Sequence, residues 1–140
     1  IGTGIADLFD FCGGLKADPA KVLYGGPMMG VAVPDVYQPV MKNTNAVLAL
    51  TEKEAKLPRT TACIRCGACT NNCPFGLAPA AILKAYDKRD VALLDELDVM
   101  TCMECGCCSF RCPANRPLTQ TNRLSKALLR EEKAKEANKA

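Results

Sequence analysis

Two stretches of the 140-residue chain decide its fold: residues 63–74 read CIRCGACTNNCP, and residues 102–113 read CMECGCCSFRCP. The second stretch repeats the first after 39 residues, with four cysteines, one glycine and a closing proline at matching positions. An internal repeat of this kind predicts two related halves that pack together as one module. Cys107 breaks the repeat, because its counterpart in the first stretch is Ala68.

The spacing of the cysteines is C-x2-C-x2-C-x3-C-P in both stretches, which is typical of loops that hold a 4Fe-4S cluster through thiolates. In two-cluster ferredoxins, the fourth cysteine of each run binds the other cluster. We therefore expect a first cluster bound by Cys63, Cys66, Cys69 and Cys112, and a second bound by Cys102, Cys105, Cys108 and Cys73. Neither site is complete until the halves meet, so cluster binding and folding should be coupled.

The structural alternative for the same eight cysteines is a pair of zinc sites, each with four thiolates, that hold the fold and transfer no electrons. Zinc ribbons use two separated C-x2-C pairs, whereas here four cysteines fall within eleven residues. The bunching of the cysteines also argues against a disulfide framework, which would disperse them. We expect the other two, Cys107 and Cys12, to be non-ligands: Cys107 should pack near a cluster, and Cys12 should be a small core residue on the apolar face of the first helix.

Composition excludes several other kinds of site. The chain has no His, which rules out Ser-His and Cys-His nucleophile pairs, Rieske centres and His-ligated haem. A formal net charge of +3 is too small to indicate nucleic-acid binding, and the sequence has no basic stripe of the kind that such proteins use. No apolar run approaches the roughly 18 residues of a membrane span. The chain starts at Ile1 without a signal-peptide pattern, so we expect a fragment of a longer protein.

Hydrophobic spacing divides the chain into four segments of an α+β protein. Residues 1–57 should form a small helix-plus-sheet unit, with a helix near 5–12 and strands at 21–24, 31–33 and 46–50. Residues 58–61 read as a linker, and residues 62–125 as the cysteine domain, with a helix over 78–97 that can break near 88–90. Pro117 opens a last helix with Leu124, Leu128 and Leu129 on one face, and residues 126–140 should be the C-terminal helix and a solvated tail.

Arginines near the cysteines suggest a way of tuning the clusters. Positive charge next to a cluster favours its reduced form and raises its potential. The alternative is that these side chains are ordinary solvated arginines. The residues concerned are Arg65, Arg111, Arg59 and Arg116.

Further motifs give the whole chain a family resemblance. They are Ile1-Gly2-Thr3, Cys12-Gly13-Gly14, the GGPMMG of residues 25–30, Lys42, the two cysteine stretches, and Lys126 in the last helix. With these motifs the chain resembles the C-terminal part of RnfC, a component of the Rnf (Rsx) electron transport complex, which is a membrane ferredoxin:NAD oxidoreductase. The resemblance runs from one end of the chain to the other.

The resemblance implies a fold and a function. Residues 1–57 would be a partial β-grasp unit of the soluble-ligand-binding (SLBB) kind, followed by a mainly helical two-cluster ferredoxin-like domain and a C-terminal helix. Its two 4Fe-4S clusters would relay electrons in a complex that couples electron flow to Na⁺ or H⁺ translocation. The chain alone would be an electron carrier with no catalytic residues, because FMN and NAD(H) would bind only in a domain upstream of Ile1.

The resemblance also implies partners and a location. The partners would be the other Rnf subunits, especially the ferredoxin-like RnfB, and the chain would lie peripherally on the cytoplasmic side of the bacterial membrane. Two alternatives stay open: a soluble flavin and iron-sulfur protein like cobalamin reductase, which the partner subunits would distinguish, and a zinc-stabilised structural module, which would be colourless and redox-silent.

Overall fold

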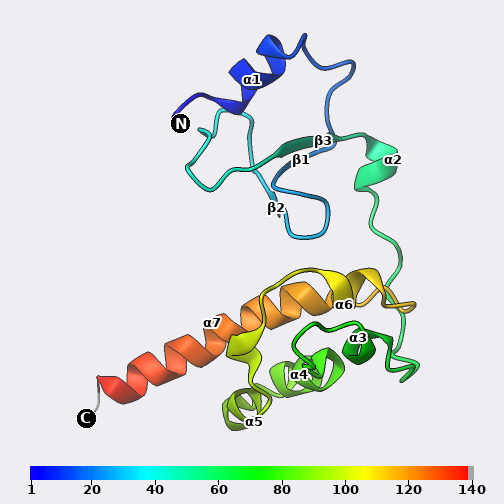
Figure 1. The fold of residues 1–140 in the computed structure, drawn as a ribbon, viewed down its shortest axis with the longest axis vertical. Coiled ribbons are helices and arrows are strands. Elements are labelled where there is room, and N and C mark those ends of the chain that lie inside the picture. Colours follow the sequence, from blue (N-terminus) through cyan, green and yellow to red (C-terminus); the bar gives the residue numbers. More distant parts are fainter. Residues whose placement is uncertain (139–140) are drawn as a thin grey trace. The chain divides into compact units, whose positions relative to one another are not determined.

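The computed structural model describes residues 1–138, which fall into two compact units, Ile1–Pro58 and a second that starts at Arg59 (Figure 1). The first contains a small antiparallel sheet, and the second is helical. This mixture of helices and a small sheet agrees with the predicted α+β class. Among the described residues, no helix has the length and apolar character needed to cross a bilayer.

The sheet of the first unit has the strand order β2-β1-β3, with antiparallel neighbours. Its strands are β1 (Lys21–Tyr24), β2 (Val31–Ala32) and β3 (Val47–Leu50), each within one residue of its predicted bounds. The turn between β1 and β2 needs glycine, because a Cβ on Gly30 would lie 2.5 Å from the carbonyl oxygen of Gly26. Helix α1 (Ile5–Phe11) was also expected, whereas α2 (Glu52–Ala55) was not.

The predicted core position of Cys12 is wrong. Cys12 is exposed at the end of α1, and the neighbouring Phe11 is 91% exposed within this structure. Ile5 is the buried residue of α1. The apolar spacing of the helix is real, but its last turn extends beyond the residues that pack against it.

Residues 59–138 of the second unit contain four short helical segments and two longer helices. Their bounds are α3 (Ala68–Asn71), α4 (Pro79–Asp87), α5 (Val91–Glu96), the 3-10 turn η1 (Val99–Thr101), α6 (Cys107–Phe110) and α7 (Leu118–Ala137). The helix predicted over 78–97 is broken near 88–90, as the sequence allowed. Arg89 takes a left-handed φ of 52°, and the Asp90 side chain caps α5 by accepting from Leu93 N at 3.0 Å.

The core of the second unit lies where α4 and α5 pack on α7 (Figure 1). Ile82, Leu94 and Leu129 are its largest buried side chains, with at most 2% exposure. Leu128 is buried as expected, but Leu124 is 42% exposed and does not share the buried face. Helix α7 continues across residue 126, and residues 139–140 of the predicted tail lie outside the described residues.

The sequence repeat is also a repeat of the backbone. Helices α3 and α6 occupy matching positions in the two halves, as do the first residues of α4 and α7. Positive φ angles recur at matching positions too: Arg65 and Glu104, Gly67 and Gly106, Gly76 and Asn115. Two loop–helix halves of the same conformation therefore carry the two cysteine stretches.

Most of the segment expected to be a linker lies alongside the second half of the repeat and is hydrogen-bonded to it. Thr61 N donates to Ala114 O at 3.0 Å, and Thr60 Oγ1 donates to Asn115 O at 3.1 Å. Asn115 Nδ2 in turn donates to Arg59 O at 3.3 Å. Residues 59–61 are thus held against residues 114–116 within the second unit, and they lead directly into Cys63.

Candidate metal centres

The loops that carry the cysteines are shaped by left-handed residues. Gly67, with φ of 74°, turns the chain from Cys66 into α3, which carries Cys69. Gly106, with φ of 85°, does the same between Cys105 and α6, which carries Cys108. Glycine takes this conformation without the steric cost of a side chain. Each loop thereby brings three cysteines to one side of its own helix turn.

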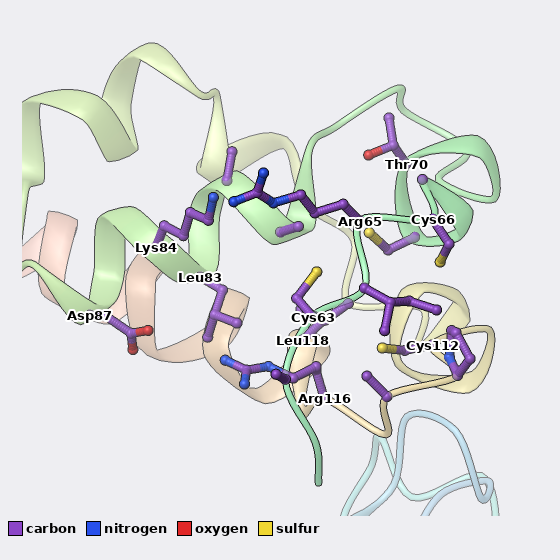
Figure 2. A pocket seen from close by; sticks show the side chains of 18 residues that line it. Cys63, Arg65, Cys66, Thr70, Leu83, Lys84, Asp87, Cys112, Arg116 and Leu118 are labelled. Carbon is purple, nitrogen blue, oxygen red and sulfur yellow. The ribbon is translucent and has the colours of Figure 1, made fainter.

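The first cavity is lined by thiols from both stretches. Its volume is about 460 Å³, and its cysteines are Cys63, Cys66, Cys69 and Cys112. Figure 2 shows Cys63 and Cys112 reaching this space from two different segments. These four are the residues that the crossover rule grouped together for the first cluster.

Charged side chains surround the first cavity. Arg65, Lys84 and Asp87 line it and are exposed, while Arg116 lines it half-buried (Figure 2). Arg116 Nη1 donates to Thr61 O at 3.4 Å, but its buried Nε has no hydrogen-bond partner within residues 1–138. Of the four arginines singled out in the sequence, Arg65 and Arg116 therefore lie at a candidate site.

The second cavity contains the other four motif cysteines. It is much smaller, about 20 Å³, and its motif cysteines are Cys73, Cys102, Cys105 and Cys108. Cys107 lines it as well, so this extra thiol lies near the candidate site as the sequence predicted. A hydrogen bond with Cys105 raises the pKa of the Cys107 thiol.

The sulfurs of the second site receive hydrogen bonds. Asn122 Nδ2 donates to Cys102 Sγ at 3.3 Å, and Glu104 N donates to the same sulfur at 3.4 Å. The Thr119 hydroxyl lies 3.6 Å from Cys108 Sγ. Asn122 and Thr119 were not predicted as part of the site, and no motif in the sequence marks either residue as a neighbour of the cysteines.

A salt-bridge cluster joins the second loop to α7. Glu104 accepts from Lys126 Nζ at 2.7 Å and from Arg123 Nε at 2.8 Å, and Lys126 Nζ also donates to Cys102 O at 2.9 Å. Partial burial alone would raise the pKa of Glu104. The hydrogen bonds and charges of Lys126 and Arg123 outweigh it, so the pKa lies below its ordinary value.

The residues present fit a pair of iron-sulfur clusters. Each cavity is lined by four motif thiols from two tight loops, the second also by Cys107, and donors to sulfur of the kind that cluster sites use are present at the second. Within residues 1–138, no three Cys, Asp or Glu side chains converge closely enough to hold a single ion. Burial raises the pKa of the Cys108 thiol, so ligation there must displace a proton.

Comparison with known proteins identifies the class of domain to which the cysteine-containing part belongs. Residues 59–116 match the family described as the 4Fe-4S dicluster domain. This part of the chain is therefore a ferredoxin-like dicluster domain, in agreement with its cysteine pattern and its repeated loop–helix fold.

The relatives of the chain are more specific. It is 42% identical over 135 residues to the C subunit of the ion-translocating oxidoreductase complex of Rhodobacter capsulatus, a match that covers 96% of this chain and 26% of that protein. The C subunit of the proton-translocating ferredoxin:NAD(+) oxidoreductase complex of Clostridium ljungdahlii is 43% identical over 82 residues, covering 59% of this chain and 18% of that protein.

The C subunit of the Na(+)-translocating ferredoxin:NAD(+) oxidoreductase complex of Acetobacterium woodii is 43% identical over 93 residues, covering 65% of this chain and 20% of that protein. The chain thus spans about a quarter or less of the length of these relatives. They are its homologues, and the resemblance inferred from the motifs is confirmed.

Proposed function

We propose that this chain relays electrons through two 4Fe-4S clusters as part of the RnfC component of an ion-translocating ferredoxin:NAD oxidoreductase complex. The observation that carries the proposal is the division of the eight motif cysteines between two cavities. Each cavity is lined by three motif cysteines from one stretch and a fourth from the other. That is the ligand arrangement of two-cluster ferredoxins.

The residues of the chain would act as ligands and as an electrostatic environment. A bound 4Fe-4S cluster supplies one-electron transfer. The proposed ligands of the first cluster are Cys63, Cys66, Cys69 and Cys112, and those of the second are Cys73, Cys102, Cys105 and Cys108. All eight motif cysteines are committed to ligation, so we assign the chain no catalytic residue of its own.

The names of the relatives support a role in a larger complex. They describe ion-translocating, proton-translocating and Na(+)-translocating oxidoreductases. We therefore propose that the relay works with the other subunits of such a complex, especially the ferredoxin-like RnfB, on the cytoplasmic face of the membrane and peripheral to it. FMN and NAD(H) would bind in a part of the protein upstream of this chain.

We also propose that residues 1–57 are part of an SLBB-like β-grasp domain. The three-stranded antiparallel sheet, with α1 next to it in the chain, is compatible with part of such a domain. A structure of the longer protein would test this assignment, because a β-grasp requires further strands paired with β2 or β3. A structure in which no further strand pairs with either β2 or β3 would contradict it.

The alternatives are less well supported. The relatives named above are subunits of ion-translocating complexes, which favours this assignment over a soluble cobalamin-reductase-like protein. The match to a 4Fe-4S dicluster family favours iron-sulfur clusters over structural zinc.

The function is tested in membranes that contain the complete complex. Substitution Cys63→Ser or Cys102→Ser in the full-length protein should abolish ferredoxin-dependent NAD reduction and the coupled ion uptake, while the complex stays assembled. Cys12→Ser is the matched control, because Cys12 is exposed and lies in the other unit. Full activity in a variant that has lost iron would refute the proposed relay.

A further inference from the structure

The two halves of the repeat differ in the side chains that α4 and α7 contribute to the cavities. Ala80 and Leu83 of α4 line the first cavity. Their counterparts 39 residues later, Thr119 and Asn122 of α7, line the second cavity. The first half thus presents apolar side chains at the two positions where the second half presents hydrogen-bond donors to sulfur.

Asn122 is poorly explained as a folding residue. It is only 1% exposed, and its buried Oδ1 has no hydrogen-bond partner in the described part of the chain. Burying an amide with one end unsatisfied is unfavourable for folding. Leu83 at the equivalent position shows that the repeat accepts an apolar side chain of similar size there.

The satisfied end of Asn122 is directed at a proposed ligand. Its Nδ2 donates to Cys102 Sγ at 3.3 Å. A thiolate accepts hydrogen bonds and cannot donate one, which requires the nitrogen rather than the oxygen of the amide to face the sulfur. Thr119 makes a longer contact, 3.6 Å from Cys108 Sγ, and its hydroxyl also lies 2.9 Å from Ser109 Oγ.

We propose that Asn122 raises the reduction potential of the second centre, by a contact that has no counterpart at the first. The inference rests on the proposed function, since it requires both clusters. Reduction adds one electron to the centre and makes or breaks no bond, so its ligand sulfurs become more negative. A hydrogen bond to sulfur is therefore stronger in the reduced form and favours it.

The first centre is tuned by a different means. Its cavity is lined by Arg65 and Lys84, both exposed, and by the half-buried Arg116. Salt screens exposed charges, but it has little effect on a buried neutral amide. The charges beside the second cavity, Glu104 with Lys126 and Arg123, are partly buried and paired, so salt screens them less. The midpoint potential of the first centre should therefore change with ionic strength more than that of the second, which distinguishes the two signals.

The test compares the intact chain with Asn122→Leu, which copies Leu83 of the first half. Both proteins are prepared anaerobically with iron and sulfide determined, then titrated with dithionite as the electron donor and followed by electron paramagnetic resonance. We expect about a tenfold decrease in the equilibrium constant for reduction of the salt-insensitive centre, which is about 59 mV for one electron. The other midpoint potential should not change.

A reciprocal variant gives an independent readout. Leu83→Asn should raise the midpoint potential of the salt-sensitive centre only. Leu124→Asn, on an exposed position of α7, is the matched control and should change neither. Asn122→Leu should also keep its iron and resist unfolding at least as well as the unsubstituted chain.

The failures of the two proposals are distinguishable. An unsubstituted chain without iron would refute the proposed function itself. Two iron-loaded centres whose midpoint potentials are unaffected by Asn122→Leu and Leu83→Asn would overturn the inference alone. Loss of iron or of stability in Asn122→Leu would overturn it too, because Asn122 would then serve the structure.

Discussion

At the scale of single residues, the crossing of ligands between the two stretches depends on two cysteines, Cys73 and Cys112. Each follows three other motif cysteines in its own stretch, yet lines the cavity of the other stretch. The exchange was predicted from the rule that the fourth cysteine of each run binds the other cluster in two-cluster ferredoxins. The sequence did not predict Asn122 and Thr119, because their approach to sulfur depends on how α7 is rotated against the second loop.

The exchange predicts which centre each cysteine supports. Cys73→Ser should remove or alter the second centre and leave the first reducible, whereas Cys112→Ser should do the reverse. Iron analysis together with the salt dependence of the remaining signal measures this. Cys107→Ser should keep both centres. Loss of the same centre in Cys73→Ser and Cys112→Ser would contradict the crossover.

Loss of the Glu104 charge should lower the free energy of unfolding. Glu104→Gln removes the charge that compensates Lys126, whose side chain is only 11% exposed. We expect a loss of about 1–2 kcal/mol, less than for a fully buried pair because Glu104 is partly solvated. Anaerobic guanidinium unfolding of the loaded chain measures it.

The control for Glu104→Gln is Asp95→Asn. Asp95 pairs with Lys133 at 2.7 Å, but both side chains are more than half exposed. Its substitution should change stability by less than about 0.5 kcal/mol. Equal effects of the two variants would show that the Glu104 cluster does not fix the loop to α7.

At the scale of elements, local sequence signals predicted the boundaries wherever they were strong. Asp90 caps α5 after a left-handed Arg89, so the long apolar pattern divides into α4 and α5. Helix α2 was missed although Thr51 and Glu54 form a capping box, because four residues are too short for helical periodicity to be visible. The burial of Leu128 and exposure of Leu124 depend on which face of α7 meets α4 and α5, which periodicity alone does not fix.

Among core substitutions, those in the packing of α4 on α7 should lower stability the most. Ile82 is fully buried between these helices, so Ile82→Ala should cost about 2–4 kcal/mol through lost burial and a cavity. Leu124→Ala, on the exposed part of α7, should cost much less. Unfolding midpoints of the two variants, measured side by side, provide the comparison, and similar midpoints would contradict the packing.

At the scale of the whole molecule, the two units should respond differently to the loss of metal. Each candidate site combines cysteines from both halves of the second unit. The hydrophobic core of this unit is small. Because thiolate ligation then contributes to folding, the second unit should be coupled to its clusters. The first unit contains none of the motif cysteines.

Removal of iron should therefore unfold much of residues 59–138 and leave the small sheet in place. Circular dichroism before and after anaerobic chelation should show a large loss of helical signal. Backbone amide exchange would assign the loss to the second unit. Full retention of helicity in the iron-free chain would contradict the coupling between ligation and folding.

The central claim, that the eight motif cysteines hold two redox-active clusters, is tested most directly by metal analysis of anaerobically purified protein. Iron, sulfide and zinc are determined together, with electron paramagnetic resonance before and after addition of dithionite. We expect about eight irons per chain and two interacting signals on reduction. Stoichiometric zinc in protein produced with ample iron, together with no signal after dithionite, would contradict it and favour a structural module.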